Sequence, residues 1–262
     1  RNQERDLKTM QLRLVSILGI AIALTMGGCG SGSESNPAAT PAATPTSAEG
    51  LWSGTTNTNR TIAGVILDDG TYYVLYSVTA NPNLIAGVVQ GNGTSSNGSF
   101  TSANARDFNL EGLGVLSATI SGSYTARQAL SGTITYGGAG SSTFTSTFSP
   151  AYDTTPSLAI LAGTYTGQAG SSAGVQSAAL TIASNGVFSG VEASGCSFTG
   201  IATPRVHGNI FDHRVTFGGA PCLFAGSTLV GIAYFDVPNS RLYAAAPTDN
   251  RTDGVIFSGT KP

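Results

Sequence analysis

Apolar and polar side chains alternate with a period of two over most of the chain after residue 50. The alternation is clearest in residues 72–78, 130–136 and 211–217, where nearly every second position is apolar or aromatic. Because successive side chains of a strand point to opposite faces, this pattern predicts strands with one buried and one solvent-facing side. We expect roughly fifteen short strands and no helix longer than two turns.

Short turn signals separate the predicted strands. Asp-Gly and Asn-Gly pairs favour type I′ turns, because both central residues of that turn need a positive φ. Such turns join antiparallel neighbours, so the sequence predicts an all-β, antiparallel fold of barrels or sandwiches. The 35 glycines exceed what turns alone need and are typical of the bent strands of small closed barrels. The turn signals are Asp69-Gly70, Asn92-Gly93, Asn97-Gly98, Asn185-Gly186, Pro238-Asn239 and Asp253-Gly254.

An internal repeat divides the β-rich part of the chain. An aromatic residue two positions before a glycine, Trp52 or Tyr165, opens each of two runs of strands. Residues 149–156 contain two prolines and are typical of a linker. We therefore predict two tandem small barrels or sandwiches, over residues 50–150 and 157–262. The alternative is one larger barrel in which the linker is a long loop.

Residues 1–28 have the features of a secretory signal peptide. After Met10, which can serve as the start, a short basic stretch precedes an apolar run over residues 14–26. The run leads into Gly27-Gly28-Cys29, which resembles the lipobox of bacterial lipoproteins, with Met26 at the position where that motif usually has Leu. The resemblance implies cleavage before Cys29 and a fatty acyl anchor, palmitate included, on that residue.

A single transmembrane anchor and simple secretion are the alternatives for this segment. The apolar run of 13 residues is shorter than the ~20 residues that a membrane-spanning helix needs. We therefore favour a lipoprotein that reaches the membrane through the lipid on Cys29. Gly30 follows the cysteine, and by resemblance to Gram-negative lipoproteins, in which Asp there retains the protein at the inner membrane, this implies the outer membrane.

Residues 29–49 predict a flexible tether. They are rich in Gly, Ser, Thr and Pro and contain no large apolar side chain, so they cannot bury enough surface to offset the entropy of ordering. Beyond residue 28 the chain has 8 Lys+Arg and 12 Asp+Glu, a mildly acidic balance. Without a basic excess for phosphate groups, we predict that the protein binds no nucleic acid.

Two cysteines remain besides Cys29. In an exported protein, Cys196 and Cys222 predict a disulfide that closes a loop of about 25 residues and stabilises the second unit by roughly 3 kcal/mol. Two free buried thiols are the alternative. A metal pair is disfavoured, because no second pair of ligands lies nearby in the sequence.

The two histidines of the chain are candidates for a metal site. The six-residue spacing of His207 and His213 predicts that both lie on one face of a strand. A catalytic metal needs three protein ligands, and the chain has no third imidazole. Since His213 alternates with Phe211 and Val215, we expect it in a barrel interior or core. A two-histidine site completed by a distant carboxylate is the alternative.

Three further motifs contain residues that can carry chemistry. Ser172 matches the Gly-x-Ser-x-Gly nucleophile elbow, but it lies in a Gly/Ser-rich loop without the helix that the motif requires. Asp68 and Asp69 are adjacent, so they point to opposite faces and predict a hairpin turn rather than paired catalytic carboxylates. We therefore predict no catalytic residue, no metal site and no cofactor. The third motif is the tyrosine cluster Tyr72, Tyr73 and Tyr76. Packing in the core and on the surface is the commoner role of such a cluster, and lining a ligand cavity is the alternative.

The lipobox, the Gly-rich tether and the glycine-aromatic strands together resemble the barrel-bearing surface lipoproteins of Gram-negative bacteria, such as the transferrin-binding and factor-H-binding groups. The resemblance implies a non-catalytic envelope lipoprotein with a binding or structural role, and it transfers no partner or site residue. A lipocalin-like carrier of a small apolar ligand is the main alternative, and a hydrolase is another. A cavity inside a barrel would favour the carrier.

Replacing Cys29 by Ser is expected to abolish lipid attachment, because the hydroxyl cannot replace the thiol that accepts the lipid. The variant should accumulate as an uncleaved or mislocalised precursor. Metabolic labelling with a palmitate analogue measures this directly, and equal label in the wild type and the variant would contradict the prediction.

Overall fold

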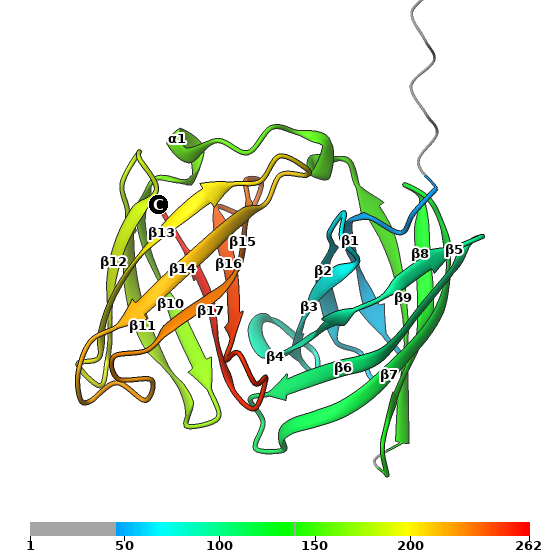
Figure 1. Ribbon diagram of the computed structural model, residues 1–262, viewed down its shortest axis with the longest axis horizontal. Helices are drawn as coiled ribbons and strands as arrows, with labels where there is room; N and C mark the ends of the chain where they lie inside the picture. Colours follow the sequence, from blue (N-terminus) through cyan, green and yellow to red (C-terminus); the bar gives the residue numbers. More distant parts are fainter. Residues whose placement is uncertain (1–45, 139) are drawn as a thin grey trace, which may run out of the picture. The chain divides into compact units, whose positions relative to one another are not determined.

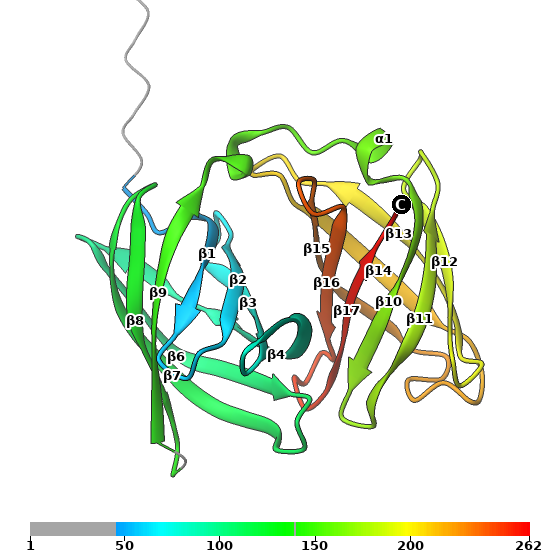
Figure 2. The same cartoon turned by 180° about the vertical axis from the view of Figure 1, so that it is seen from behind.

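Antiparallel strands make up nearly the whole described chain, residues 46–138 and 140–262 of a computed structural model (Figures 1 and 2). The predicted signal peptide, Cys29 and the tether up to residue 45 lie outside the described residues. The last residues of the predicted tether, 46–49, pack against the strands, where Ala48 is fully buried and the carbonyl of Thr46 accepts a 2.6 Å hydrogen bond from Tyr124, so the prediction of a flexible segment is wrong for them. The strands form two sheets, each closed on itself into a barrel. The prediction of tandem small antiparallel barrels is thus confirmed, and the alternative of one larger barrel is wrong.

Barrel 1 is a ring of eight strands with a ninth strand at its edge. Strand β1 hydrogen-bonds to β9 and β4 to β6, which closes the ring, while β5 extends the edge of β6. The strands are β1 (Gly50–Thr56), β2 (Thr61–Ile66), β3 (Thr71–Val78), β4 (Asn81–Asn92), β5 (Thr94–Ser96), β6 (Ser99–Asn109), β7 (Gly114–Thr125), β8 (Ala129–Tyr136) and β9 (Gly140–Ser149).

Barrel 2 is a ring of eight strands in chain order. Each strand pairs with the next, and the first pairs with the last. The strands are β10 (Gly163–Ser171), β11 (Gly174–Ile182), β12 (Val187–Glu192), β13 (Ser197–Pro204), β14 (Phe211–Phe217), β15 (Thr228–Asp236), β16 (Arg241–Pro247) and β17 (Gly254–Thr260).

Two single helical turns lie between the barrels in sequence, the 3-10 turn η1 (Pro150–Asp153) and α1 (Leu158–Leu161). Helix α1 lies at one end of barrel 2 (Figure 2), where Leu161 is fully buried and its carbonyl accepts a 2.5 Å hydrogen bond from Tyr165. Lys261 caps this end: its Nζ donates to the carbonyl of Ala162 and lies 4.4 Å from the centre of the Phe235 ring. In the described part of the chain, no helix is long and apolar enough to cross a membrane.

Four of the six predicted turns are formed. Asp253-Gly254 is not one of them, because the chain turns at residues 248–251 and Gly254 is the first residue of β17. Asn97 and Gly98 both have positive φ, 49° and 79°, as a type I′ hairpin between β5 and β6 requires. Asn92-Gly93 makes no hairpin, which corrects the prediction. Strands β4 and β5 both pair with β6, so the chain continues in the same direction through this pair.

Each barrel has a hydrophobic core of inward-facing residues, and a third hydrophobic cluster joins the outer faces of the two barrels. In β3, Tyr72 and Tyr76 point into barrel 1, whereas Tyr73 and Leu75 are buried in the third cluster. This strand is therefore buried on both faces, contrary to the prediction of one solvent-facing side. Barrel 2 contributes Ile210, Ile232, Ala245 and Ile256 to the same cluster.

Two arginines of barrel 2 add polar contacts at the edges of this cluster. Arg205 forms ion pairs with Asp68 of barrel 1 at 2.8 Å and with Asp212 of its own barrel at 2.7 Å. Arg251 donates to the backbone carbonyls of Gln90 and Asn104, at 2.7 and 2.8 Å. Together with the buried apolar faces, these bonds form an interface between the two barrels, which are therefore joined by more than the linker.

Residues 50–150 and 157–262, expressed separately, are each expected to fold, because each barrel closes with its own hydrogen bonds and buries its own core. The two pieces should then associate when mixed, through the shared hydrophobic cluster. Amide NMR spectra of each piece and of the mixture measure both effects. Replacing Ile232 by Glu should prevent the association and leave the dispersed spectrum of the second piece. Two pieces that are unfolded alone would show that the boundary at residues 149–157 is wrong.

Candidate functional site

The two barrels differ in how completely side chains fill their interiors. Barrel 1 encloses a cavity of about 280 Å³, whereas the interior of barrel 2 leaves only about 60 Å³. In barrel 2, Leu161 of α1 and the rings of Phe188 and Phe257 help to occupy the interior. An eight-stranded barrel is just wide enough to be filled by its side chains or to hold one small ligand. Barrel 1 is therefore the candidate binding site.

Aromatic side chains close one end of the cavity, which we call the floor. The rings of Trp52 and Phe148 meet edge to face with centroids 5.7 Å apart, and those of Tyr72 and Phe100 with centroids 5.8 Å apart. Trp52 Nε1 donates a 3.0 Å hydrogen bond to the carbonyl of Ala48, so the segment before β1 also covers this end. Branched aliphatic side chains, shorter than these rings, line the middle of the barrel and leave space between them: Ile62, Val74, Val89, Ile120 and Ile134.

A buried polar network lies toward the other end of the cavity. Asp107, with 3% of its surface exposed, accepts a 2.6 Å hydrogen bond from the Tyr76 hydroxyl and a 2.9 Å bond from the Tyr136 hydroxyl. Asn109 Nδ2 donates to the Tyr76 oxygen at 3.1 Å. Gly87 makes room for Tyr76, because a Cβ at residue 87 would lie only 2.3 Å from the Tyr76 hydroxyl oxygen. Asp107 is thus the one carboxylate in the lining, and Arg60 and several Thr and Ser hydroxyls are its other polar members outside this network.

Burial shifts the pKa values of this network. Desolvation raises the pKa of Asp107, opposed by the hydrogen bonds from Tyr76 and Tyr136 and by the charge of Arg60. Desolvation and the nearby Asp107 charge raise the pKa values of both tyrosines. The tyrosine hydroxyls consequently stay protonated and hold the carboxyl group in place. The lone pairs of Asp107 and of the hydroxyl oxygens can accept a hydrogen bond from a ligand.

The cavity reaches the surface beyond this network, at the end we call the mouth. Its lining there includes Leu113, which is 65% exposed, and the exposed Thr58. Arg60 spans the mouth: it forms a 2.7 Å ion pair with Glu111 and stands 5.5 Å from the centre of the Tyr76 ring. A small ligand can therefore enter past a charged pair and meet the Asp107 network before the apolar interior.

A single extra residue in β6 turns Asp107 inward. Phe100 and Ser102 are the buried inward positions in the first part of the strand. The pairing with β7 then shifts between Ser102 and Ala105, and from Ala105 onward the odd-numbered residues face the interior. Alternation counted from Phe100 would place Asp107 outside. Sequence reasoning missed this residue because a β-bulge changes the parity without a clear sequence signal.

Two of the three tyrosines of β3 line a cavity, which is the alternative that sequence reasoning favoured less. Tyr72 and Tyr76 line the cavity of barrel 1, and Tyr76 takes part in the polar network. Tyr73 is buried against barrel 2, and the burial raises its pKa to about 12. Because neighbouring side chains of a strand point to opposite faces, Tyr72 and Tyr76 line the cavity and Tyr73 lies in the interface.

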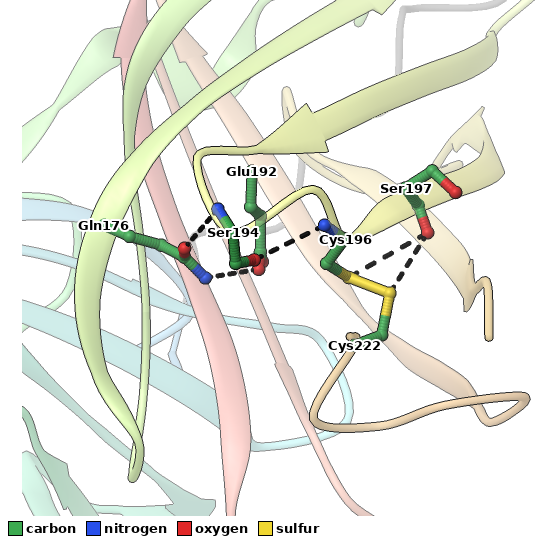
Figure 3. The surroundings of a disulfide bond; sticks show 6 residues. All are labelled: Gln176, Glu192, Ser194, Cys196, Ser197 and Cys222. Carbon is green, nitrogen blue, oxygen red and sulfur yellow. Dashed lines mark hydrogen bonds between the residues drawn. A yellow bond between two sulfur atoms is a disulfide. The ribbon is translucent and has the colours of Figure 1, made fainter. Parts of the chain in front are cut away.

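The predicted disulfide between Cys196 and Cys222 is present (Figure 3), with the two Cα atoms 4.6 Å apart. It joins the start of β13 to the loop of residues 218–227 between β14 and β15. Cys29 is outside the described residues, so lipid attachment stays a prediction.

The two histidines lie apart in the structure. His213 is inward in barrel 2, with its ring centroid 6.3 Å from that of Phe188. His207 is exposed in the loop between β13 and β14, so the prediction that both share one strand face is wrong. In the part of the chain that the structure describes, no group of three or more His, Cys, Asp or Glu side chains could hold a metal ion.

The remaining candidates have structural roles. Ser172 lies in the turn between β10 and β11, where its hydroxyl and backbone amide donate to the carboxylate of Asp253. Asp69 accepts a 2.8 Å hydrogen bond from the Thr71 amide in the turn between β2 and β3. Its neighbour Asp68 pairs with Arg205 instead, so the two carboxylates share no site.

No family model and no curated protein sequence matches the chain. Among solved structures, it is similar to the isotype 1 transferrin binding protein B from serogroup B Neisseria meningitidis, with 9% sequence identity and a TM-score of 0.30. The match covers 78% of this chain and 66% of that chain, just under two thirds of its length. At this level of similarity no function or site residue can be carried over.

Lowering the pH from 7 to 5 is expected to destabilise the protein through His213. Burial lowers the pKa of His213 to about 4, below its ordinary value of 6.5, against the opposing effect of the Ala245 and Ile232 backbones. Below pH 6.5 the imidazole of His213 therefore binds a proton in the unfolded state but not in the folded state. The stability present above pH 6.5 is lost as the pH falls toward 4, by about 2 kcal/mol at pH 5.

Urea unfolding of the wild type and of His213→Leu at pH 7, 6 and 5 measures this loss. The variant should lose less stability on acidification than the wild type. The matched control is His207→Gln in the exposed loop, which should keep the wild-type profile. Parallel pH profiles for the wild type and His213→Leu would contradict the prediction.

Proposed function

We propose that this protein is a non-catalytic, lipid-anchored envelope protein whose first barrel binds a small apolar ligand that carries a hydrogen-bond donor. The observation that carries the proposal is the open interior of barrel 1 beside the filled interior of barrel 2. Both barrels have eight strands in their rings, so the difference lies in their inward side chains and in α1. Barrel 1 holds the ligand, and barrel 2 supports barrel 1 through the shared interface.

The lining determines the chemistry of the ligand. Apolar side chains around the floor and the middle favour an apolar body, and the volume of about 280 Å³ is near the lower end of typical ligand pockets, ~300–1,000 Å³. Asp107 and its tyrosine partners offer acceptor oxygens near the mouth, so a hydroxyl or amine group is favoured at that end of the ligand. Since the lining contains neither histidine nor cysteine, the site lacks a His-activated nucleophile, and binding without reaction is the function that it supports best.

The anchor completes the proposal. The lipobox resemblance at Cys29 and the glycine that follows it support attachment to the outer membrane. The part of the tether before residue 46 would then hold the barrels near a membrane, where apolar molecules collect. A carrier role, as in the lipocalin-like alternative, combines this location with the cavity of barrel 1.

The neutral fluorescent probe N-phenyl-1-naphthylamine is expected to bind in barrel 1 and to gain fluorescence there, because it has an apolar body and one N–H donor. Replacing Val74 by Trp should fill the middle of the cavity and weaken binding by about tenfold or more, a change of about 1.4 kcal/mol. Fluorescence titration of the purified protein measures the affinity.

The matched control for this titration is Val230→Trp, which adds the same side chain at an exposed position of barrel 2. It should bind the probe as the wild type does. A wild type that gives no fluorescence gain, or equal affinities for the wild type and Val74→Trp, would contradict the proposed function.

A further inference from the structure

A second cavity lies at the end of barrel 2 opposite α1. Its volume is about 360 Å³, and its walls come from the turn between β10 and β11, the turn between β12 and β13, and the loop of residues 218–227. It is separate from the cavity of barrel 1, with which it shares no lining residue. We call it the vestibule of barrel 2.

The bottom of the vestibule is apolar except for Glu192. Ala169, Phe217 and Val255 line both the vestibule and the small space in the filled interior, together with Glu192, so these four residues form the boundary between the two. The ring of Phe224 packs on that of Phe217, with centroids 5.5 Å apart. Leu223, which is 54% exposed, lies on the outer wall. The vestibule therefore offers aromatic and aliphatic surface to a small organic group.

One carboxylate is the only ionisable side chain in this lining. Glu192 Oε2 accepts a 2.5 Å hydrogen bond from Gln176 Nε2, and Gln176 Oε1 accepts a 3.0 Å bond from the Ser194 amide, which fixes the orientation of the glutamine amide (Figure 3). Within the described residues, Glu192 forms no ion pair with a basic side chain. Burial also raises its pKa. The carboxylate is thus positioned by a neutral amide and has no positive partner in the part of the chain that the structure describes.

The disulfide holds the outer wall of the vestibule. Cys222 directly precedes Leu223 and Phe224, and its bond to Cys196 ties this loop to the start of β13 (Figure 3). Cys196 itself belongs to the lining. The aromatic wall and the carboxylate are therefore kept at fixed positions relative to each other, as a preorganised binding site requires.

From this geometry we propose that the vestibule of barrel 2 binds a small organic cation, an ammonium group on an aromatic or aliphatic body. The positive charge pairs with Glu192, and the body lies against Phe217 and Phe224, whose ring faces attract cations. A neutral molecule of the same shape lacks the ionic contact, and an anion is repelled. This site is independent of the ligand cavity of barrel 1.

Isothermal titration calorimetry of the full chain with benzylammonium, benzyl alcohol and benzoate at pH 7 and low salt tests the proposal. Benzylammonium should bind about tenfold or more tightly than benzyl alcohol, and benzoate should show no binding. Glu192→Gln should reduce the affinity for benzylammonium to that for benzyl alcohol. Asp236→Asn, which removes a carboxylate at the other end of the same barrel, is the matched control and should leave the affinity unchanged.

Three outcomes would overturn the proposal. They are no binding of benzylammonium, equal binding of benzylammonium and benzyl alcohol, and binding that survives in Glu192→Gln. The comparison of the three ligands uses the wild type alone, so it decides even if the glutamine variant does not fold. In that case Leu223→Trp, a change at an exposed wall position, should narrow the vestibule and weaken binding of benzylammonium.

Discussion

The hydrogen bonds that join the first and last strands of each sheet set the conditions for everything else in this protein. Once β1 pairs with β9 and β10 with β17, every second side chain must fit inside a ring of eight strands. Such a ring can be filled or can hold one ligand, and the side chains decide which. In barrel 2, phenylalanines and the buried Leu161 fill the interior. In barrel 1, aliphatic residues in the middle leave an open cavity.

The same closure determines where polar groups can lie. A barrel interior has no free strand edge, so an inward polar side chain has to find its partners among other inward side chains or at an open end. Asp107 meets this requirement with two tyrosine hydroxyls near the mouth. His213 has no side-chain partner among the described residues, and burial keeps its ring neutral. Asp107 can thus bind a ligand, whereas the buried His213 lowers the stability of the protein at low pH.

Local sequence patterns predicted the fold but only part of the site. Alternation correctly placed Tyr72 and Tyr76 on one face, and the export features correctly paired Cys196 with Cys222. The inward turn of Asp107 depends on a bulge in β6, which no local pattern marks. The burial of Tyr73 and Leu75 depends on a second barrel far along the chain, although residues 72–76 are apolar on both parities, a signal of burial on both faces.

NMR spectra of protein labelled at isoleucine δ1 methyl groups test most directly whether barrel 1 is the ligand site. Ile62, Ile66, Ile120 and Ile134 line its cavity, Ile182 lies inside barrel 2, and Ile232 lies in the interface. On addition of N-phenyl-1-naphthylamine, we predict that the four cavity methyls shift and that those of Ile182 and Ile232 stay in place. Shifts confined to Ile182 or Ile232, with the four cavity methyls unmoved, would contradict a ligand site inside barrel 1.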